Sequence, residues 1–119
     1  METTRLGVIE SKFADIVWSN APISTAELIK IAEKELGWKR TTTYTVLKRL
    51  SERGLFRNDG GTVEVLISKD RFSTMQSERI VDESFGGSLP AFIAAFTRGK
   101  RLTEFEVDEI RQMIDNYKG

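Results

Sequence analysis

The sequence contains no cysteine and no histidine among its 119 residues. Without cysteine there is no disulfide framework, no thiol chemistry and no thiolate ligand for a metal ion. Without histidine the chain lacks the most common general base of enzymes and a common zinc ligand. These two absences predict a protein with no metal ion and no cofactor, and a reducing cytoplasm is the expected location.

Other signatures of enzymes and membrane proteins are missing as well. The glycine pairs Gly60-Gly61 and Gly86-Gly87 are isolated, so they predict turns and not a phosphate-binding loop. No apolar run approaches the ~20 residues of a membrane span. The first ten residues, METTRLGVIE, lack the basic-then-apolar order of a signal peptide. We therefore expect neither catalysis nor a membrane partner.

Neither sign of charge is in excess over the whole chain, but positive charge is concentrated in one stretch. Lys+Arg and Asp+Glu both number 18, so the net charge is zero. Between residues 39 and 57, however, six cations accompany the single acid Glu52, a net charge of +5. A basic patch on a neutral chain is the electrostatic footprint expected of a DNA-binding protein. A basic surface that has no partner is the alternative.

The patch coincides with the stretch 39–53, KRTTTYTVLKRLSER, which predicts a helix that ends at Gly54. Its apolar stripe follows spacings of three, four and seven residues. The opposite side has hydroxyl groups near its N-terminal end and cations further along, which suits a helix in the major groove of DNA. An ordinary solvated helix face is the alternative. The candidate contacts on this side are Thr41, Thr42, Tyr44, Thr45, Lys48 and Arg49.

Two shorter helices are expected before this one. The first, over residues 6–18, has apolar residues at helical spacing, with Ile9 on the apolar stripe and Glu10 facing solvent. The second begins after Ser24, the expected N-cap, and ends at Gly37. A short helix, a glycine-containing turn and a longer hydroxyl-rich helix are the layout of a helix-turn-helix.

Two runs of strand type follow the helix-turn-helix. Residues 55–58 and 62–67 flank the sequence Asp59-Gly60-Gly61, and this arrangement predicts a β-hairpin. We expect the hairpin to be a wing beside the third helix, with Arg57 and the turn amides near DNA phosphates. Residues 1–70 are therefore predicted to form a winged-helix DNA-binding domain.

Residues 71–119 predict three further helices, over 71–85, over 89–97 and from Thr103 onward. The second of these is apolar on nearly all sides and needs cover on more than one face. A unit of this size is too small to bury so many large side chains by itself. A second copy of the same segment is the expected cover, which gives a two-fold homodimer. The alternative is a monomer in which these helices fold back onto the winged helix.

The predicted fold is therefore mostly α (α+β): an N-terminal winged helix-turn-helix with a small β-hairpin wing, followed by C-terminal dimerisation helices. The expected domains are residues 1–70 and 71–119. The residues expected at the dimer contact are the large apolar side chains Phe85, Leu89, Phe92, Ile93, Phe96, Ile110 and Met113.

Several stretches resemble the penicillinase-repressor (BlaI/MecI) family, namely APISTAELI, GWKRTTTYTVLKRLSERGL, FGGSLPAFIAAF and LTEFEVDEIRQMI. The resemblance covers nearly all of residues 6–114. It implies a cytoplasmic homodimer that binds a palindromic operator in double-stranded DNA, with the third helix in the major groove, and that represses transcription. A winged-helix module that binds proteins and never meets DNA is the competing hypothesis, because a fold alone does not decide function.

The chain departs from the family's pattern in three places, one of which is the wing strand over residues 62–67, which lacks the aromatic pattern common in relatives. Lys39 and Arg40 stand where the family often has Ser-Pro or Ser-Tyr, which predicts a lost helix cap and a different operator or more phosphate binding. The antibiotic-resistance repressors are inactivated by cleavage of an Asn-Phe bond, and the matching pair here is Ala95-Phe96, which speaks against a cleavage switch. An inactivating protease or an antirepressor is still an implied partner. Since cysteine is absent, copper sensing through a cysteine cluster is excluded.

Overall fold

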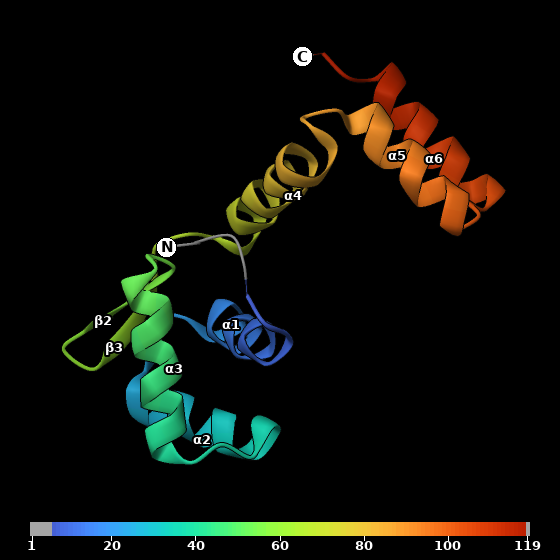
Figure 1. Ribbon diagram of the computed structural model, residues 1–119. Helices are drawn as coiled ribbons and strands as arrows, with labels where there is room; N and C mark the ends of the chain where they lie inside the picture. Colours follow the sequence, from blue (N-terminus) through green and yellow to red (C-terminus); the bar gives the residue numbers. More distant parts are fainter. Residues whose placement is uncertain (1–5, 119) are drawn as a thin grey trace. The chain divides into compact units, whose positions relative to one another are not determined.

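The structure is a computed structural model that describes residues 6–118 of the chain (Figure 1). The described part is mostly helical and has one small antiparallel sheet, as the sequence predicted. The chain divides into two compact units between Arg79 and Ile80. In chain order the elements are α1 (Val8–Asn20), β1 (Ile23–Ser24), α2 (Thr25–Leu36), α3 (Arg40–Glu52), β2 (Phe56–Asp59), β3 (Thr62–Val65), α4 (Lys69–Phe85), α5 (Leu89–Gly99) and α6 (Glu104–Asp115).

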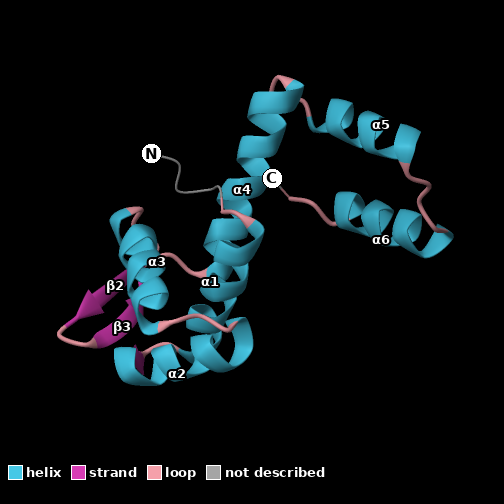
Figure 2. Ribbon diagram, turned by 60° about the horizontal axis from the view of Figure 1, so that its bottom comes forward, coloured by secondary structure: helices cyan, strands magenta, loops and turns pink. Residues whose placement is uncertain are grey.

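The predicted wing is confirmed as the antiparallel pair β2 and β3 (Figure 2). Asp59 lies opposite Thr62, so Gly60 and Gly61 form a two-residue turn. Their φ angles are +61° and +93°, values that glycine adopts readily and other residues rarely do. The glycine pair therefore sets the register of the wing.

A third strand, β1, was not expected from the sequence. Ile23 lies opposite Val63 and Ser24 opposite Thr62, which gives the sheet the order β1-β3-β2. A strand of two residues is too short for an alternation of apolar and polar positions to be recognised. Ser24 also caps α2 as predicted, because its Oγ accepts a hydrogen bond of 3.1 Å from the amide of Glu27.

The turn between α2 and α3 has the expected glycine stop. Gly37 has a φ of +69°, in the left-handed region, and its amide donates to the carbonyl of Glu33 at 3.0 Å. Lys39 occupies the N-cap of α3, and no side-chain hydrogen bond caps the helix there. The expectation that the cap is lost is confirmed, so the first amides of α3 are not covered by the N-cap side chain.

The core of the first unit lies between α1, α2, α3 and the sheet. Its largest fully buried side chains come from every one of these elements or the segments that join them. Trp38 stacks on Phe13 of α1, with ring centroids 5.2 Å apart. Trp18 contacts the rings of Phe56 and Phe72, so the start of α4 belongs to this core. The largest fully buried side chains are Phe13, Val17, Leu28, Thr43, Leu50, Leu55, Phe56 and Val63.

In the first turn of α1, the residue that faces the core is not the one that the sequence predicted. Ile9 was predicted on the apolar stripe and is 52% exposed, whereas Glu10 was predicted to face solvent and is half-buried. The helix buries Phe13 and Val17, and a position three residues before Phe13 lies on the same face. Both expectations were wrong, because the inward position in this turn is occupied by a charged residue.

The second unit has well-capped helices with little buried surface. Ser88 Oγ accepts from the amide of Ala91 at 3.1 Å. Thr103 and Glu106 form a reciprocal capping box at the start of α6, with bonds of 2.9 and 3.0 Å. The amide and hydroxyl of Thr103 hold the pKa of the Glu106 carboxyl below its usual value. In the described chain, no side chain of α5 or α6 is buried.

None of the helices within residues 6–118 is both long and apolar enough to cross a membrane. The longest, α4, has 17 residues and carries charges along its length.

We expect Leu50→Ala to lower the free energy of unfolding by about 2–5 kcal/mol, because the side chain of Leu50 extends from α3 into the core and is fully buried. Ile9→Ala is the matched control, since it removes a similar side chain from an exposed position and should cost below about 1 kcal/mol. Urea unfolding followed by circular dichroism measures both. Equal losses in the two variants would show that the α3 stripe does not form the core.

Candidate nucleic-acid interface

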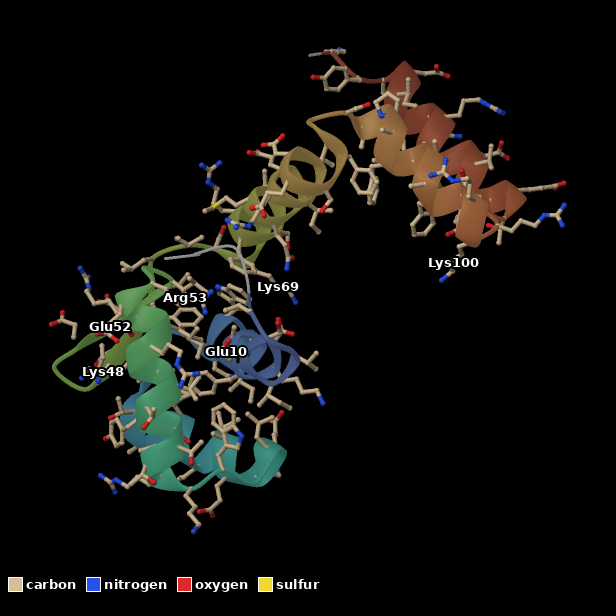
Figure 3. All side chains as sticks on the ribbon, in the orientation of Figure 1. Glu10, Lys48, Glu52, Arg53, Lys69 and Lys100 are labelled. Atoms are coloured by element: carbon tan, nitrogen blue, oxygen red, sulfur yellow. The ribbon has the colours of Figure 1, made fainter. Side chains whose placement is uncertain are left out.

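Helix α3 separates its residues into a buried face and an exposed face. Thr43, Val46, Leu47 and Leu50 are buried, as the stripe predicted. The residues between them are exposed to solvent, and Figure 3 shows Lys48 and Glu52 on the same side of the helix. All of the residues predicted to contact DNA from this helix and its N-cap are exposed, namely Lys39, Arg40, Thr41, Thr42, Tyr44, Thr45, Lys48 and Arg49.

The hydroxyl of Thr45 is already engaged as a donor. Its Oγ1 donates to the carbonyl of Thr41 at 2.9 Å, one turn earlier in the helix. A hydroxyl that donates in this way retains lone pairs that can accept. Thr45 therefore presents an acceptor at the surface, and amino groups on adenine and cytosine are the matching donors in the major groove.

Arg40 and Tyr44 form a second small cluster at the start of the helix. The guanidinium of Arg40 lies over the ring of Tyr44, 5.7 Å from its centroid. This cation–π contact orients a cation at the N-terminal end of α3. It gives Tyr44 a structural role that spacing alone did not indicate.

Glu10 of α1 connects to Arg49 of α3 and to Arg53, the C-cap residue of that helix. Its Oε2 accepts from Arg49 Nη1 at 3.0 Å, and its Oε1 lies 3.7 Å from Arg53 Nη1. Oε1 also accepts from the amide of Gly7 at 3.2 Å. The side chain of Arg53 is 10% exposed and that of Glu10 20%, whereas that of Arg49 is 54% exposed (Figure 3). Arg53 therefore lies on the interior side of this cluster, although it is one of the six cations from which the sequence predicted an exposed basic patch.

The Glu10 carboxyl is ionised at neutral pH. Burial by itself raises its pKa. The hydrogen bonds from Arg49 and from the Gly7 amide, together with the positive charges of Arg49 and Arg53, outweigh burial and hold the pKa below its ordinary value. A negative charge thus lies directly behind the exposed face of α3.

The wing has a comparable pair. Arg57 and Glu64 are cross-strand partners, and Nε and Nη2 of Arg57 both donate to Glu64 Oε1, at 3.2 and 2.9 Å. The bond to Glu64 and its charge raise the pKa of Arg57 further above its usual value. Since Arg49 and Arg53 are paired with Glu10, the acids neutralise part of the +5 patch that the sequence predicted.

A groove lies between α3 and the wing. It has a volume of about 530 Å³, and Lys48 and Arg57 both line it, one from α3 and one from the wing. The Oγ of Ser51 is buried at this groove with no hydrogen-bond partner among the described residues. Two cations from different elements suit an anionic backbone that runs between them. The further lining residues are Tyr44, Leu47, Phe56, Asn58 and Leu66.

Glu10, Ser51 and Glu64 were not recognised from the sequence. Glu64 could have been found, because residues 57 and 64 are equidistant from the Gly60-Gly61 turn and face each other in any two-residue hairpin. Glu10 gave no comparable signal, since its partner Arg49 is 39 residues away in the chain.

The residues predicted at the dimer contact lie in the second unit. Phe85 and Phe92 are half-buried, and their rings meet edge to face at 5.3 Å. The Ala95-Phe96 bond, at which the sequence argued against a cleavage switch, lies inside helix α5. The remaining predicted contacts are exposed in the single chain, namely Leu89, Ile93, Phe96, Ile110 and Met113.

Comparisons with known proteins agree with this architecture. The pattern of the penicillinase repressor family matches residues 6–116. The penicillinase repressor of Bacillus licheniformis is 26% identical over 113 residues, which cover 92% of this chain and 88% of the relative. The methicillin resistance regulatory protein MecI of Staphylococcus aureus is 19% identical over 118 residues, 96% of each chain. The match extends through the winged helix and the helices after it, and the chain therefore belongs to the penicillinase repressor family of transcriptional repressors.

Proposed function

We propose that the protein is a homodimeric repressor that binds a palindromic operator in double-stranded DNA through α3. The observation that carries this proposal is the exposed face of α3, where hydroxyl groups and cations lie beside a groove lined by Lys48 and Arg57. Membership of a repressor family agrees with it. Its expected place of action is the cytoplasm.

In this proposal α3 lies in the major groove. Thr45 accepts hydrogen bonds from base amino groups, and Arg49 donates to bases or phosphates from the same side of the helix. Lys48 binds phosphate as a point charge. Thr41 and Thr42, together with Lys39 and Arg40, meet the DNA at the uncapped N-terminal end, where the helix dipole favours an anion.

The wing is proposed to contact the flanking DNA backbone. Arg57 is 57% exposed in its pair with Glu64, so its guanidinium is accessible to a phosphate. The amide of Gly61 donates to Asn58 Oδ1 at 3.1 Å, which removes it from the amides expected to reach DNA. The wing contribution thus rests mainly on Arg57.

The second unit is proposed to join two chains. Leu89, Ile93 and Phe96 repeat at spacings of three and four, so they share one face of α5, and this face is exposed in the single chain. A second copy that covers this face removes apolar surface from water. Two joined winged helices bind two half-sites with a raised effective concentration. Two-fold symmetry implies half-sites one or two helical turns apart, about 34 Å per turn.

A protein–protein module without DNA binding is the competing function. Such a module would have the same winged-helix fold but would not need a basic face on α3. Gel mobility of the full chain with a mixed duplex pool at two salt concentrations discriminates the two, because phosphate contacts weaken as salt rises. Selection of a bound sequence from the pool would then identify the operator.

The first prediction concerns base readout by α3. Thr45→Ala should relax the preferred sequence and cost about 1–3 kcal/mol of operator binding, because it removes an acceptor at the base edges. Lys48→Ala should weaken binding to all sequences and reduce the salt slope by roughly one unit. Fluorescence anisotropy on operator and scrambled duplexes measures both. Unchanged affinity in both variants would exclude α3 as the DNA-reading helix.

The second prediction concerns the wing. Arg57→Ala should reduce affinity without changing the preferred site, because a phosphate contact carries no sequence information. Lys30→Ala is the control, since Lys30 is also an exposed cation paired with an acid, Glu27, but lies on α2. Operator selection with both variants provides the measurement. A changed consensus sequence for Arg57→Ala would mean that the wing reads bases.

The third prediction concerns the dimer. Phe96→Asp should convert the protein to monomers and weaken operator binding by about 100-fold or more, because the avidity of two joined sites is lost. Tyr117→Asp is the control, since Tyr117 is equally aromatic, more exposed and outside the predicted contact. Sedimentation and DNA titration measure both effects. If Phe96→Asp stayed dimeric, the proposed α5 contact would be wrong.

A further inference from the structure

Three charged groups from two elements meet behind the exposed face of α3: the carboxylate of Glu10 and the guanidinium groups of Arg49 and Arg53. We propose that Glu10 is a positioning residue that makes α3 selective for its operator by orienting Arg49, and that its charge also lowers attraction to DNA of any sequence. The inference rests on the proposed function, since it concerns how the same surface distinguishes one DNA from another.

The carboxylate of Glu10 is held in position by two neighbouring groups. Its Oε1 accepts from the amide of Gly7 at 3.2 Å and lies 3.7 Å from the largely buried Arg53. The following turns of α1 carry Phe13 and Val17, which are completely buried in the core. An acceptor held by its own helix and by a buried cation stays in position when the exposed groups around it move.

Arg49 links this fixed acceptor to the exposed face. One of its donors, Nη1, is committed to Glu10 Oε2 at 3.0 Å. The side chain is 54% exposed, so other edges of the planar guanidinium remain accessible to a ligand. A guanidinium held along one edge presents its remaining donors in a defined plane, which suits the paired acceptors O6 and N7 of guanine better than a phosphate in any orientation.

The charge of Glu10 acts on every DNA sequence alike. Binding to non-specific DNA is almost wholly electrostatic. A carboxylate 3.0 Å from the exposed Arg49 offsets the attraction of that cation for phosphates, and at 20% exposure its field is only partly screened by solvent. The negative charge thus weakens binding to all sequences, and the orientation of Arg49 restores binding to the operator alone. The orientation therefore increases the ratio of specific to non-specific affinity, while the charge lowers the non-specific affinity itself.

Glu10→Gln tests the proposal, because it removes the charge and replaces one carboxylate oxygen by an NH2 group that cannot accept from Arg49, while the amide oxygen can still accept from Gly7. Asp15→Asn is the matched control: it removes the same charge from the same helix, but Asp15 pairs with Lys69 of α4 at 2.9 Å and not with α3. The probes are the selected operator duplex and a scrambled duplex of equal length, measured by fluorescence anisotropy at three salt concentrations.

We expect Glu10→Gln to bind the scrambled duplex about 3–10-fold more tightly, with a salt slope steeper by roughly one unit. Its ratio of operator to scrambled affinity should fall about tenfold, an amount comparable to one wrong base pair. Asp15→Asn should keep the wild-type ratio. A merely structural tie between α1 and α3 would change the melting temperature without changing the salt slope.

Arg49→Lys provides a second test that does not disturb α1. It keeps the positive charge but removes the planar fork, so operator affinity should fall with the salt slope unchanged. In a chain that carries Arg49→Gln, the further change Glu10→Gln should no longer alter the ratio, because Arg49 carries the coupling.

The outcomes separate the two proposals. If the wild-type chain binds both duplexes equally or binds neither, the operator-binding function is wrong and the role of Glu10 falls with it. If the wild-type chain prefers its operator and Glu10→Gln keeps the same ratio as Asp15→Asn, only the role of Glu10 is overturned. A preserved ratio in Arg49→Lys would likewise overturn it.

Discussion

The burial of one face of α3 is the constraint on which the rest of the first unit depends. Thr43, Val46, Leu47 and Leu50 enter the core, so the residues between them must face solvent. The same core anchors α1 through Phe13 and the sheet through Val63. The surface proposed to read DNA is therefore held by the packing of the helix that carries it, and not by a flexible loop.

The charges around this surface are more balanced than a count of basic residues indicates. Glu10 neutralises part of the charge behind α3, and Glu64 does the same for Arg57 on the wing. An exposed cation that has an acid neighbour is oriented, and it attracts phosphates less strongly than a free cation does. In the proposed complex with DNA, the two pairs would orient Arg49 and Arg57 and weaken their attraction to phosphates of any sequence.

The second unit, unlike the first, leaves many of its apolar side chains exposed. Its helices are well capped at Ser88 and Thr103, so they are locally stable, but they leave apolar side chains such as Leu89 and Phe96 exposed. Exposed apolar patches on a folded chain mark a contact surface. A division between a unit that buries its own core and a unit that offers its apolar face fits a regulator that binds as a pair.

The sequence by itself determined the elements whose signals are local. The helical spacing of α3, the stops at Gly37 and Gly54, the Gly60-Gly61 turn and the caps at Ser88 and Thr103 all depend on residues a few positions apart. Helical spacing also supplied the proposed DNA and dimer contacts, and the family resemblance implied the same third helix and a homodimer.

Only the tertiary structure decided the pairing of β1 with β3, the inward position of Glu10 and the burial of Arg53. These contacts join residues that lie far apart in the chain, as Glu10 and Arg49 do across 39 positions. No local pattern encodes them, because they arise only when the elements of the first unit pack together.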